Sequence, residues 1–469
     1  MNQNKTYYLI RYGLGLIFLL TSILIFLRWM PHPSIVEDTF LEGKAIYPFI
    51  PTEANFAVDA AYSYAPQIEG TEAVSNWHSS FFMYEGRVVR QILQFLVGHS
   101  ISGFDIVTFL WYVSALVILV CFCVFYINSV RANQSIFVQF ALGLSLMTAA
   151  HYTNVYLDFF FLSTLLITFL ICYYMHEIKG RWIRVSLLIT IAFLVINMVN
   201  YRKNAILLAP VFFLYAYHQY WKMRCLKLFT LYVLYLIAMI PFAISLFLPV
   251  KKAYPTNPMI ESDLRIAAIL RGEQELMRKK LKYCGFTDTE HPFRNSLSPV
   301  CVGDYMTGHN IDQSALLKLY SEEWKSNTKT MLTAKVIQII EFYAAGYLPG
   351  PVQNALLSIY PALKNNNDAM KFHRQGGRKL WPMRMLLLFT LSWISVKTFS
   401  NIRKVSNQTQ SNLVWLVSTV SVLYAASYLI VTPTPDMRYL TPSVVLGLPA
   451  AVLYISVLLR KKRQNAAND

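Results

Sequence analysis

Long apolar runs recur along the chain and constrain its fold more than any other feature. The first run, from Tyr8 to Trp29, is long enough to cross a bilayer, which takes about 20 apolar residues. Because no small-residue cleavage site follows it, we expect a retained membrane helix and not a signal peptide. Hydrophobic residues make up 55% of the chain and charged residues only 14%, a composition too apolar for a soluble domain of 469 residues. The sequence therefore predicts an all-α polytopic membrane protein.

The apolar runs are best explained by about ten transmembrane helices. Their expected ranges are 8–28, 104–126, 135–150, 156–175, 185–199, 205–221, 228–249, 385–399, 413–431 and 442–459. With the N-terminus inside, every cytoplasmic loop is basic, as the positive-inside rule requires. The basic positions are Lys5, Arg131, Lys179, Arg181, Arg184, Lys222, Arg224, Lys227, Arg403, Lys404 and Arg460 through Arg463. Both termini are therefore expected in the cytoplasm.

Two large loops are then expected on the extracytoplasmic face. The first, about 29–103, belongs to an N-terminal transmembrane module of residues 1–249. The second loop, residues 250–384, is expected to form an extracytoplasmic helical region. Residues 385–469 are expected to hold the C-terminal transmembrane helices.

The second loop contains two segments whose apolar residues recur near helical spacing. They predict amphipathic helices at 261–283 and 313–345, which could lie along the membrane surface. Cys284 and Cys301 also fall in this loop, where an oxidising compartment would allow a disulfide. Two free thiols are the alternative.

Two short charged turns are expected on the outer face, where basic residues beside the membrane are unusual. The first is Tyr201-Arg202-Lys203-Asn204, and the second is Asp436-Met437-Arg438-Tyr439, whose flanking prolines stiffen the backbone. Snorkelling of the cations to lipid headgroups would explain these turns. We favour anion binding instead, with lipid-linked phosphate as the leading ligand and with Asn204, Asp436 and Tyr439 in support.

Acidic residues in the first outer loop are candidates for acid–base chemistry. Glu37 and Asp38 follow the first membrane helix closely, and a carboxylate there could take a proton from an attacking hydroxyl. The pair could instead hold a divalent cation through its oxygens, or it could be a solvated acidic loop. Asp59 is the rival acid, because its apolar neighbours would raise its pKa if it were buried.

Three further positions admit both a functional and a structural interpretation. Glu85-Gly86-Arg87 precedes an amphipathic run, and Gly followed by Arg at a helix start could aim a guanidinium at phosphate. The alternative is an interfacial helix whose arginines meet lipid headgroups. His151 and Asp158 flank an outer turn near membrane depth, where ionisable groups are expensive and usually have a role. A hydrogen-bonded structural histidine is the alternative there.

Several function classes lack support in the sequence. The net charge of +17 could suggest nucleic acid, but the cations cluster beside membrane ends and no nucleic-acid motif accompanies them. HExxH, paired CxxC and GxSxG patterns do not occur, so zinc-protease and serine-hydrolase chemistry are not expected.

The chain resembles the GT-C superfamily of polytopic membrane glycosyltransferases, particularly the bacterial serotype-converting O-antigen glucosyltransferases and related uncharacterised families. The resemblance rests on the acidic pair Glu37-Asp38, the segment Tyr84-Glu85-Gly86-Arg87, the turn Tyr201-Arg202-Lys203-Asn204 and the element Arg438-Tyr439-Leu440-Thr441-Pro442. The likeness spans most of the chain, although each motif is short.

This resemblance implies a transferase in the bacterial cytoplasmic (inner) membrane. It would move a sugar from a polyprenyl-phosphate donor to a surface polysaccharide or lipid-linked acceptor on the extracytoplasmic face. It implies a catalytic carboxylate at Asp38, with Glu37 beside it. It also implies that donor phosphate is bound by Arg87, Arg202, Lys203 and Arg438. Membrane lipids are expected partners, a divalent cation is an open alternative, and nucleic acid is not expected.

Two other functions compete with this one. An O-antigen or polysaccharide polymerase would also be polytopic and would use outer arginines on lipid-linked glycans. A lipid-glycan transporter or flippase should show internal repeats and polar residues at mid-membrane. Because the charges gather at one face and no repeat is evident, the pattern favours a one-sided enzyme over a conduit.

Overall fold

The computed structural model describes residues 3–29, 65–70, 80–151, 156–175, 178, 180–222, 230, 233, 258–273, 313–343, 350–362, 377–402, 409–428 and 440–468. All regular secondary structure in these ranges is helical, which confirms the all-helical fold class. The chain divides into two compact units, each described separately below. Unit 1 comprises Met1–Lys251, Leu387–Ala425 and Leu440–Asp469, and unit 2 comprises Lys252–Leu386 and Ala426–Tyr439.

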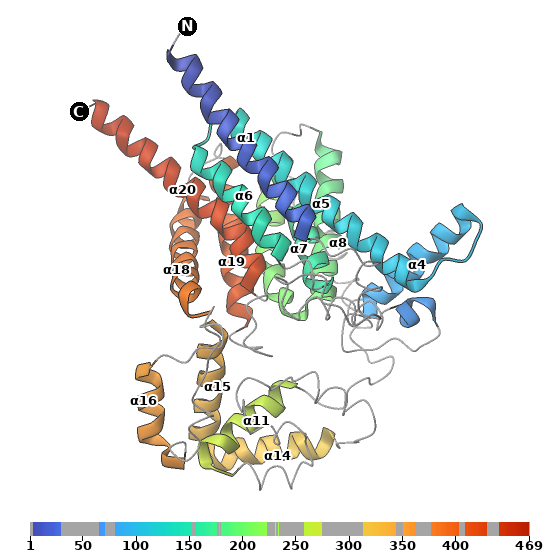
Figure 1. Cartoon of the computed structure of the whole chain (residues 1–469), viewed down its shortest axis with the longest axis vertical. Helices are drawn as coiled ribbons and strands as arrows, with labels where there is room; N and C mark the ends of the chain where they lie inside the picture. The colour runs from blue at the N-terminus through green and yellow to red at the C-terminus, as the bar shows by residue number, and fades with distance from the viewer. Residues whose placement is uncertain are drawn as a thin grey trace. The chain divides into compact units, whose positions relative to one another are not determined.

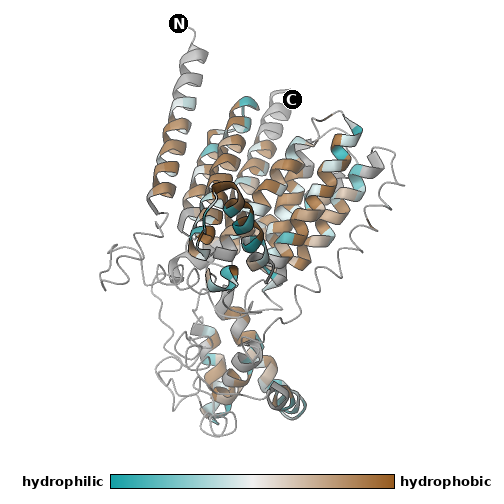
Figure 2. Cartoon of the chain, turned by 90° about the vertical axis from the view of Figure 1, so that its right-hand side faces the viewer, coloured by the Kyte–Doolittle hydropathy of each residue, from teal (hydrophilic) through white to brown (hydrophobic). Residues whose placement is uncertain are grey.

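Unit 1 is a bundle of helices that are hydrophobic along most of their length (Figures 1 and 2). Its helices are α1 (Gln3–Trp29), α4 (Ser80–Val97), α5 (Gly103–Arg131), α6 (Ile136–His151), α7 (Tyr156–Tyr174), α8 (Arg181–Tyr201), the 3-10 helix η1 (Lys203–Leu208), α9 (Ala209–Lys222), most of α18 (Gly377–Ile402), α19 (Thr409–Ser427) and α20 (Thr441–Asn468).

Within the described ranges, three helical segments are long and apolar enough to cross a membrane: Gly103–Arg131, Arg181–Val199 and Thr441–Leu459. Shorter apolar helices cover Tyr12–Leu27, Ile136–Ala149, Phe159–Tyr174, Ala205–Gln219, Met385–Phe399 and Leu413–Ser427. Together these helices fall on the expected spans other than 228–249, most of which lies outside the described residues. The helices have the character of a membrane protein, and the count of ten spans stays a prediction.

Glycines allow α1 and α6 to pack closely. A Cβ on Gly15 would lie 2.1 Å from Gln139 Oε1, and a Cβ on Gly143 would lie 2.6 Å from a ring carbon of Phe18 and 2.7 Å from Ser22 Oγ. Small residues at such seams let membrane helices approach each other. Because the contacts advance in the same direction along both helices, α1 and α6 run parallel.

Contacts between helices define two ends of unit 1. At one end, the ring of Phe160 near the start of α7 lies 6.0 Å from the ring of Tyr201, the last residue of α8. We call this the Tyr201 end. At the other end, Asn128 Nδ2 donates to Tyr174 Oη at 3.0 Å, near the C-termini of α5 and α7. We call this the Arg131 end, after the last residue of α5.

Several basic residues of the described helices lie at the Arg131 end. α8 begins there with Arg181, followed one turn later by Arg184, and α9 ends there at Lys222. The stacked rings of Phe161 and Tyr424 place the end of α19 at the Tyr201 end, so α20 starts there and runs back. The start of α1 and the end of α20 therefore lie at the same end of the unit (Figure 1).

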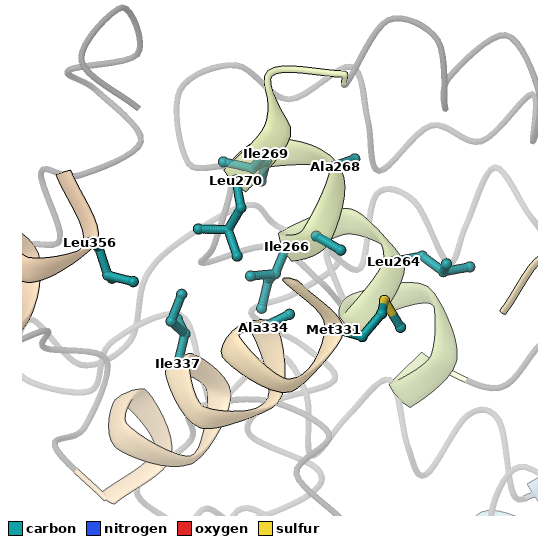
Figure 3. Close-up of a cluster of buried hydrophobic side chains, with 10 residues drawn as sticks. Leu264, Ile266, Ala268, Ile269, Leu270, Met331, Ala334, Ile337 and Leu356 are labelled. Carbon is teal, nitrogen blue, oxygen red and sulfur yellow. The ribbon is translucent and has the colours of Figure 1, made fainter. Parts of the chain in front are cut away.

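Unit 2 has its own hydrophobic core (Figure 3). Its helices are α11 (Pro258–Arg271), α14 (Gln313–Ser326), α15 (Thr328–Tyr343) and α16 (Gly350–Ile359). The core consists of buried residues from α11, α15 and α16, namely Leu264, Ile266, Ala267, Ala268, Ile269, Leu270, Met331, Ala334, Ile337 and Leu356. Buried charge is paired: Tyr320 Oη donates to Asp263 Oδ2 at 2.8 Å, and Lys335 Nζ lies 3.5 Å from the same oxygen.

The helix expected at 261–283 is shorter and starts earlier than the sequence suggested. α11 ends at Arg271 because Gly272 adopts a left-handed φ of +73°. The amide of Gly272 donates to Ile269 O and that of Glu273 to Ala268 O, which is a Schellman motif. Five consecutive residues, 266–270, are buried on all sides of the helix. The apolar residues of α11 therefore form the core of unit 2, and a position of this helix along the membrane surface stays a prediction.

The helix expected at 313–345 is in fact two helices. α14 ends at Ser326, α15 begins at Thr328, and Asn327 between them is not helical. Asn327 Nδ2 donates to Glu323 Oε2 at 2.9 Å, a local side-chain bond of the kind that competes with helix continuation. Glu323 also forms an ion pair with Arg271, the last residue of α11. The break between α14 and α15 therefore lies close to the end of α11.

Candidate functional site

The structure describes the predicted site residues to different extents. The side chains of Arg87 and Arg202 are described, and the backbones of His151, Asp158, Lys203 and Asn204 are helical. His151 ends α6, and Asp158 lies in the first turn of α7. The remaining candidates lie outside the described residues: Glu37, Asp38, Asp59, Cys284, Cys301, Asp436, Arg438 and Tyr439. Their assignments stay predictions.

A hydrogen bond between α4 and α8 joins two of the segments singled out in the sequence. Tyr201 Oη donates to Glu85 Oε2 at 2.6 Å, across a sequence separation of 116 residues. Glu85 stands beside Gly86 and Arg87, and Tyr201 stands beside Arg202. The segment Glu85-Gly86-Arg87 and the turn Tyr201-Arg202-Lys203-Asn204 are therefore neighbours at the Tyr201 end of unit 1.

The turn between α8 and α9 is as tight as the sequence suggested. α8 stops at Tyr201 because Arg202 leaves the helical region, with φ −140° and ψ 106°. Its amide still caps Met198 O at 2.9 Å, and its carbonyl accepts from the amide of Ala205 at 2.8 Å, which starts η1. Pro210 sits in the first turn of α9, where a missing amide N–H costs little. Arg202 is thus held at the tip of a rigid helical hairpin.

Glu85 is the titratable group that this geometry singles out. Burial raises the pKa of its carboxyl to about 7, although the hydrogen bond from Tyr201 acts in the opposite direction. A carboxyl with a pKa near neutrality exists in both protonation states at physiological pH, which suits a group that exchanges protons or switches a contact.

Gly86 lies in the middle of α4, so the expectation of a Gly-Arg pair at a helix start is wrong. α4 begins six residues earlier, at Ser80. The glycine allows close packing, because a Cβ at this position would lie 2.7 Å from Ile68 Cδ1 and the Ile68 side chain would have to shift. Arg87 consequently does not receive help from a helix N-terminus. Its Nε instead donates to Gln67 O at 2.8 Å, and its guanidinium lies 5.7 Å from the centre of the Tyr84 ring.

The helical turn at 65–69 fastens α4 to the start of α5. Arg90 Nε donates to Ile101 O at 2.7 Å, and Arg90 Nη1 donates to Glu69 O at 3.2 Å. The amide of Gly103, the first residue of α5, donates to Glu69 Oε1. A Cβ on Gly103 would lie 2.2 Å from the carbonyl oxygen of Ala65, so only glycine fits there. These contacts join α4, the helix that carries Glu85, to the start of α5.

An apolar cavity of ≈ 120 Å³ lies elsewhere in unit 1, between α5, α6, α7, α19 and α20. Its lining includes Phe122, Leu142, Phe169 and Val445, with Asn128 among the few polar residues. No charged residue lines it, so it does not offer the cations that a phosphate group requires. No cluster of three metal-ligating side chains occurs among the residues that the structure describes.

Glu85 belongs to the motif Glu85-Gly86-Arg87, but the sequence alone assigned it no role. The sequence did contain an indication, because a carboxylate beside a Gly-Arg pair in an amphipathic outer segment is a candidate catalytic or binding group. The sequence could not reveal its partner, because Tyr201 reaches it only through the packing of α4 on α8. No family model, curated protein or solved structure matches this chain. The site must therefore be interpreted from its own residues.

Proposed function

We propose that this protein is a membrane glycosyltransferase of the GT-C type. It transfers a sugar from a polyprenyl-phosphate donor to a surface glycan or lipid-linked acceptor outside the bacterial cytoplasmic membrane. The observation that carries the proposal is the hydrogen bond from Tyr201 to Glu85. It brings together two of the segments on which the GT-C resemblance rests, although they are far apart in the chain.

The distribution of charge supports the proposed orientation. In the proposed topology ten helices cross the membrane and both termini are cytoplasmic. The Arg131 end, which holds Arg131, Arg181 and Arg184, then faces the cytoplasm as the positive-inside rule requires. The Tyr201 end faces outward, so that the proposed chemistry takes place on the extracytoplasmic side.

The first outer loop starts at the same end as the Tyr201–Glu85 pair. α1 runs parallel to α6, which ends just before α7 begins, so Trp29 lies at the Tyr201 end. From Trp29, the nine residues to Asp38 can span up to about 30 Å of extended chain. We therefore propose that Asp38 lies on the same side of the membrane as the hairpin tip at Arg202.

In the proposed reaction, the carboxylate of Asp38 takes the proton from an acceptor hydroxyl. The hydroxyl oxygen forms a bond to the anomeric carbon of the donor, and the bond from that carbon to the phosphate oxygen breaks. The departing polyprenyl phosphate keeps the electron pair. Arg87, Arg202, Lys203 and Arg438 are proposed to stabilise its negative charge. A divalent cation at Glu37 and Asp38 would supply further charge stabilisation, and it is an alternative use of those carboxylates.

The proposal predicts an extra sugar on the surface glycan of cells that produce this protein. The measurement is a compositional and linkage analysis of surface polysaccharide from otherwise identical cells with and without the protein. A new side-branch sugar is the expected result. An altered chain length with unchanged composition would indicate a polymerase instead, and no change in either property in a suitable host would contradict both enzymes.

Replacing Glu85 with glutamine is expected to remove a titration near pH 7 from the transfer rate. In the native protein the carboxyl ionises as the pH rises through about 7. The ionised form accepts the Tyr201 hydrogen bond more strongly and holds the Arg202 turn, so the rate should rise with pH by about tenfold. Glu85→Gln keeps an acceptor oxygen but has no charge to lose, so its rate should stay level across this range.

The pH profile is measured with a polyprenyl-phosphate sugar in membrane vesicles. Glu322→Gln, at an exposed position of unit 2, is the control and should keep the native profile. A native profile in Glu85→Gln would show that another group titrates, and it would remove Glu85 from the site.

A further inference from the structure

α4 has an apolar face that is open to its surroundings. Phe95 is 87% exposed, Leu96 71%, Val88 54% and Ile92 53%. These residues are spaced three, four and eight positions apart, so they form one stripe along the helix. A stripe of this size is unusual on a surface in contact with water, and it usually marks an interaction site.

The opposite face of α4 is fixed against the protein. Met83 and Gly86 are buried, and Gly86 is in contact with Ile68. Arg87 and Arg90 both donate to backbone carbonyls on this side. The arginines therefore point away from the apolar stripe, and their hydrogen bonds determine which face of the helix is turned outward.

The apolar stripe continues along the chain into a helix that can cross the membrane. Gly98 ends α4 with a left-handed φ of +78°, and its amide donates to Gln94 O. Only the segment 98–102 separates α4 from α5, which has the most apolar span in the described part of the chain. α5 also exposes apolar side chains near its start, including Phe109 and Val113. α4 is thus joined by a short link to the start of a helix that is long and apolar enough to cross a membrane.

We propose that α4 is an interfacial helix and that its partner is the phospholipid bilayer at the Tyr201 end. Its exposed stripe, Val88, Ile92, Phe95 and Leu96, lies at the boundary between headgroups and acyl chains, as in other amphipathic helices that lie on membranes. In the interfacial alternative considered from the sequence, the arginines of this segment meet lipid headgroups. In the structure Arg87 and Arg90 instead donate to backbone carbonyls, and the apolar residues face outward.

This arrangement has a consequence for the neighbouring site. Glu85 belongs to the same helix, and Tyr201 is bonded to it. An α4 held in the interface would therefore keep the Glu85–Tyr201 pair at a constant depth, close to the headgroups. The inference concerns the contact with lipid alone and does not depend on glycosyl transfer.

Photo-crosslinking of the full-length protein in its native membrane tests this proposal. The photoreactive residue p-benzoylphenylalanine replaces Phe95 in one variant and Ile92 in a second. Leu116, exposed in the middle of α5, is the lipid-facing control, and Glu322, exposed on the polar surface of α14, is the polar control. Mass spectrometry of the irradiated protein then identifies each adduct as lipid, protein or solvent-quenched.

The expected result is lipid adducts at Phe95 and Ile92 in a yield similar to that at Leu116 and about ten times that at Glu322. Adducts with another segment of this chain, or with a second copy, would show that protein covers the face and would overturn the proposal. The absence of any adduct at both positions, with the Leu116 control active, would place the face in water and would overturn it equally. None of these outcomes depends on whether the protein transfers a sugar.

Discussion

Asp38→Asn is expected to lower the rate of sugar transfer by about 10²–10⁴-fold, the range that one general base contributes. Asparagine has nearly the shape of aspartate but cannot accept the proton of the acceptor hydroxyl. The rate is measured in membrane vesicles with a polyprenyl-phosphate sugar and an excess of acceptor. Binding of the donor should change little, because the phosphate is assigned to other residues.

Asp105→Asn is the matched control for this variant. Asp105 lies at the Tyr201 end, in the first turn of α5, where its carboxylate accepts from Ser102 Oγ at 2.7 Å. This interaction is local, so Asp105→Asn should transfer sugar at close to the native rate. If Asp38→Asn is as active as the control, the base is another group. Glu37, Asp59 and Glu85 would be the next acids to replace.

Arg202→Ala is expected to lower transfer by about 10²–10³-fold, the cost of removing one group that stabilises developing charge. Arg202 lies in the tight turn between α8 and η1, at the Tyr201 end where the proposal places the donor phosphate. Arg202→Lys should recover part of the rate, because it keeps the charge but loses the two-pronged contact with phosphate. Arg438→Ala is expected to behave in the same way as Arg202→Ala.

The control for this series is Arg131→Ala, which removes an arginine at the opposite end of unit 1. It changes the net charge equally and should leave transfer near the native rate. Equal losses in Arg202→Ala and Arg131→Ala would indicate an effect of charge on insertion. Native activity in Arg202→Ala would exclude the turn from donor binding. Protein amounts in the membrane are compared by immunoblot in every variant.

The predictable part of the fold depended on residues close together in the chain. The apolar runs are long enough to predict helices from composition and length alone, and the described helices follow them closely. The turn at Arg202 was predictable for the same reason, because charged and amide residues interrupt two apolar runs there. The amphipathic segments of the second loop were predictable as helices, but their ends were not.

The helix ends that were mispredicted involve contacts that periodicity does not report. Gly272 ends α11 because its backbone adopts a left-handed conformation. The sequence after Gly272 keeps a helix-like spacing of apolar and charged residues, so periodicity alone does not reveal this end. Asn327 separates α14 from α15, and its partner Glu323 also binds Arg271 of another helix. At both positions the backbone conformation of one residue determined where the helix ended. The spacing of apolar residues does not predict that conformation.

The sequence by itself determined that this chain is helical and apolar, that its basic residues gather beside particular helix ends, and that Arg202 sits in a tight turn. Each of these features depends on composition or on neighbours within a few residues. Only the tertiary structure decided that Glu85 meets Tyr201, that Gly86 packs on Ile68 within a helix, and that the arginines of α4 face the protein. The physical reason is that such contacts depend on side-chain shape across helices, and residues that are distant in the chain carry no periodic signal of one another.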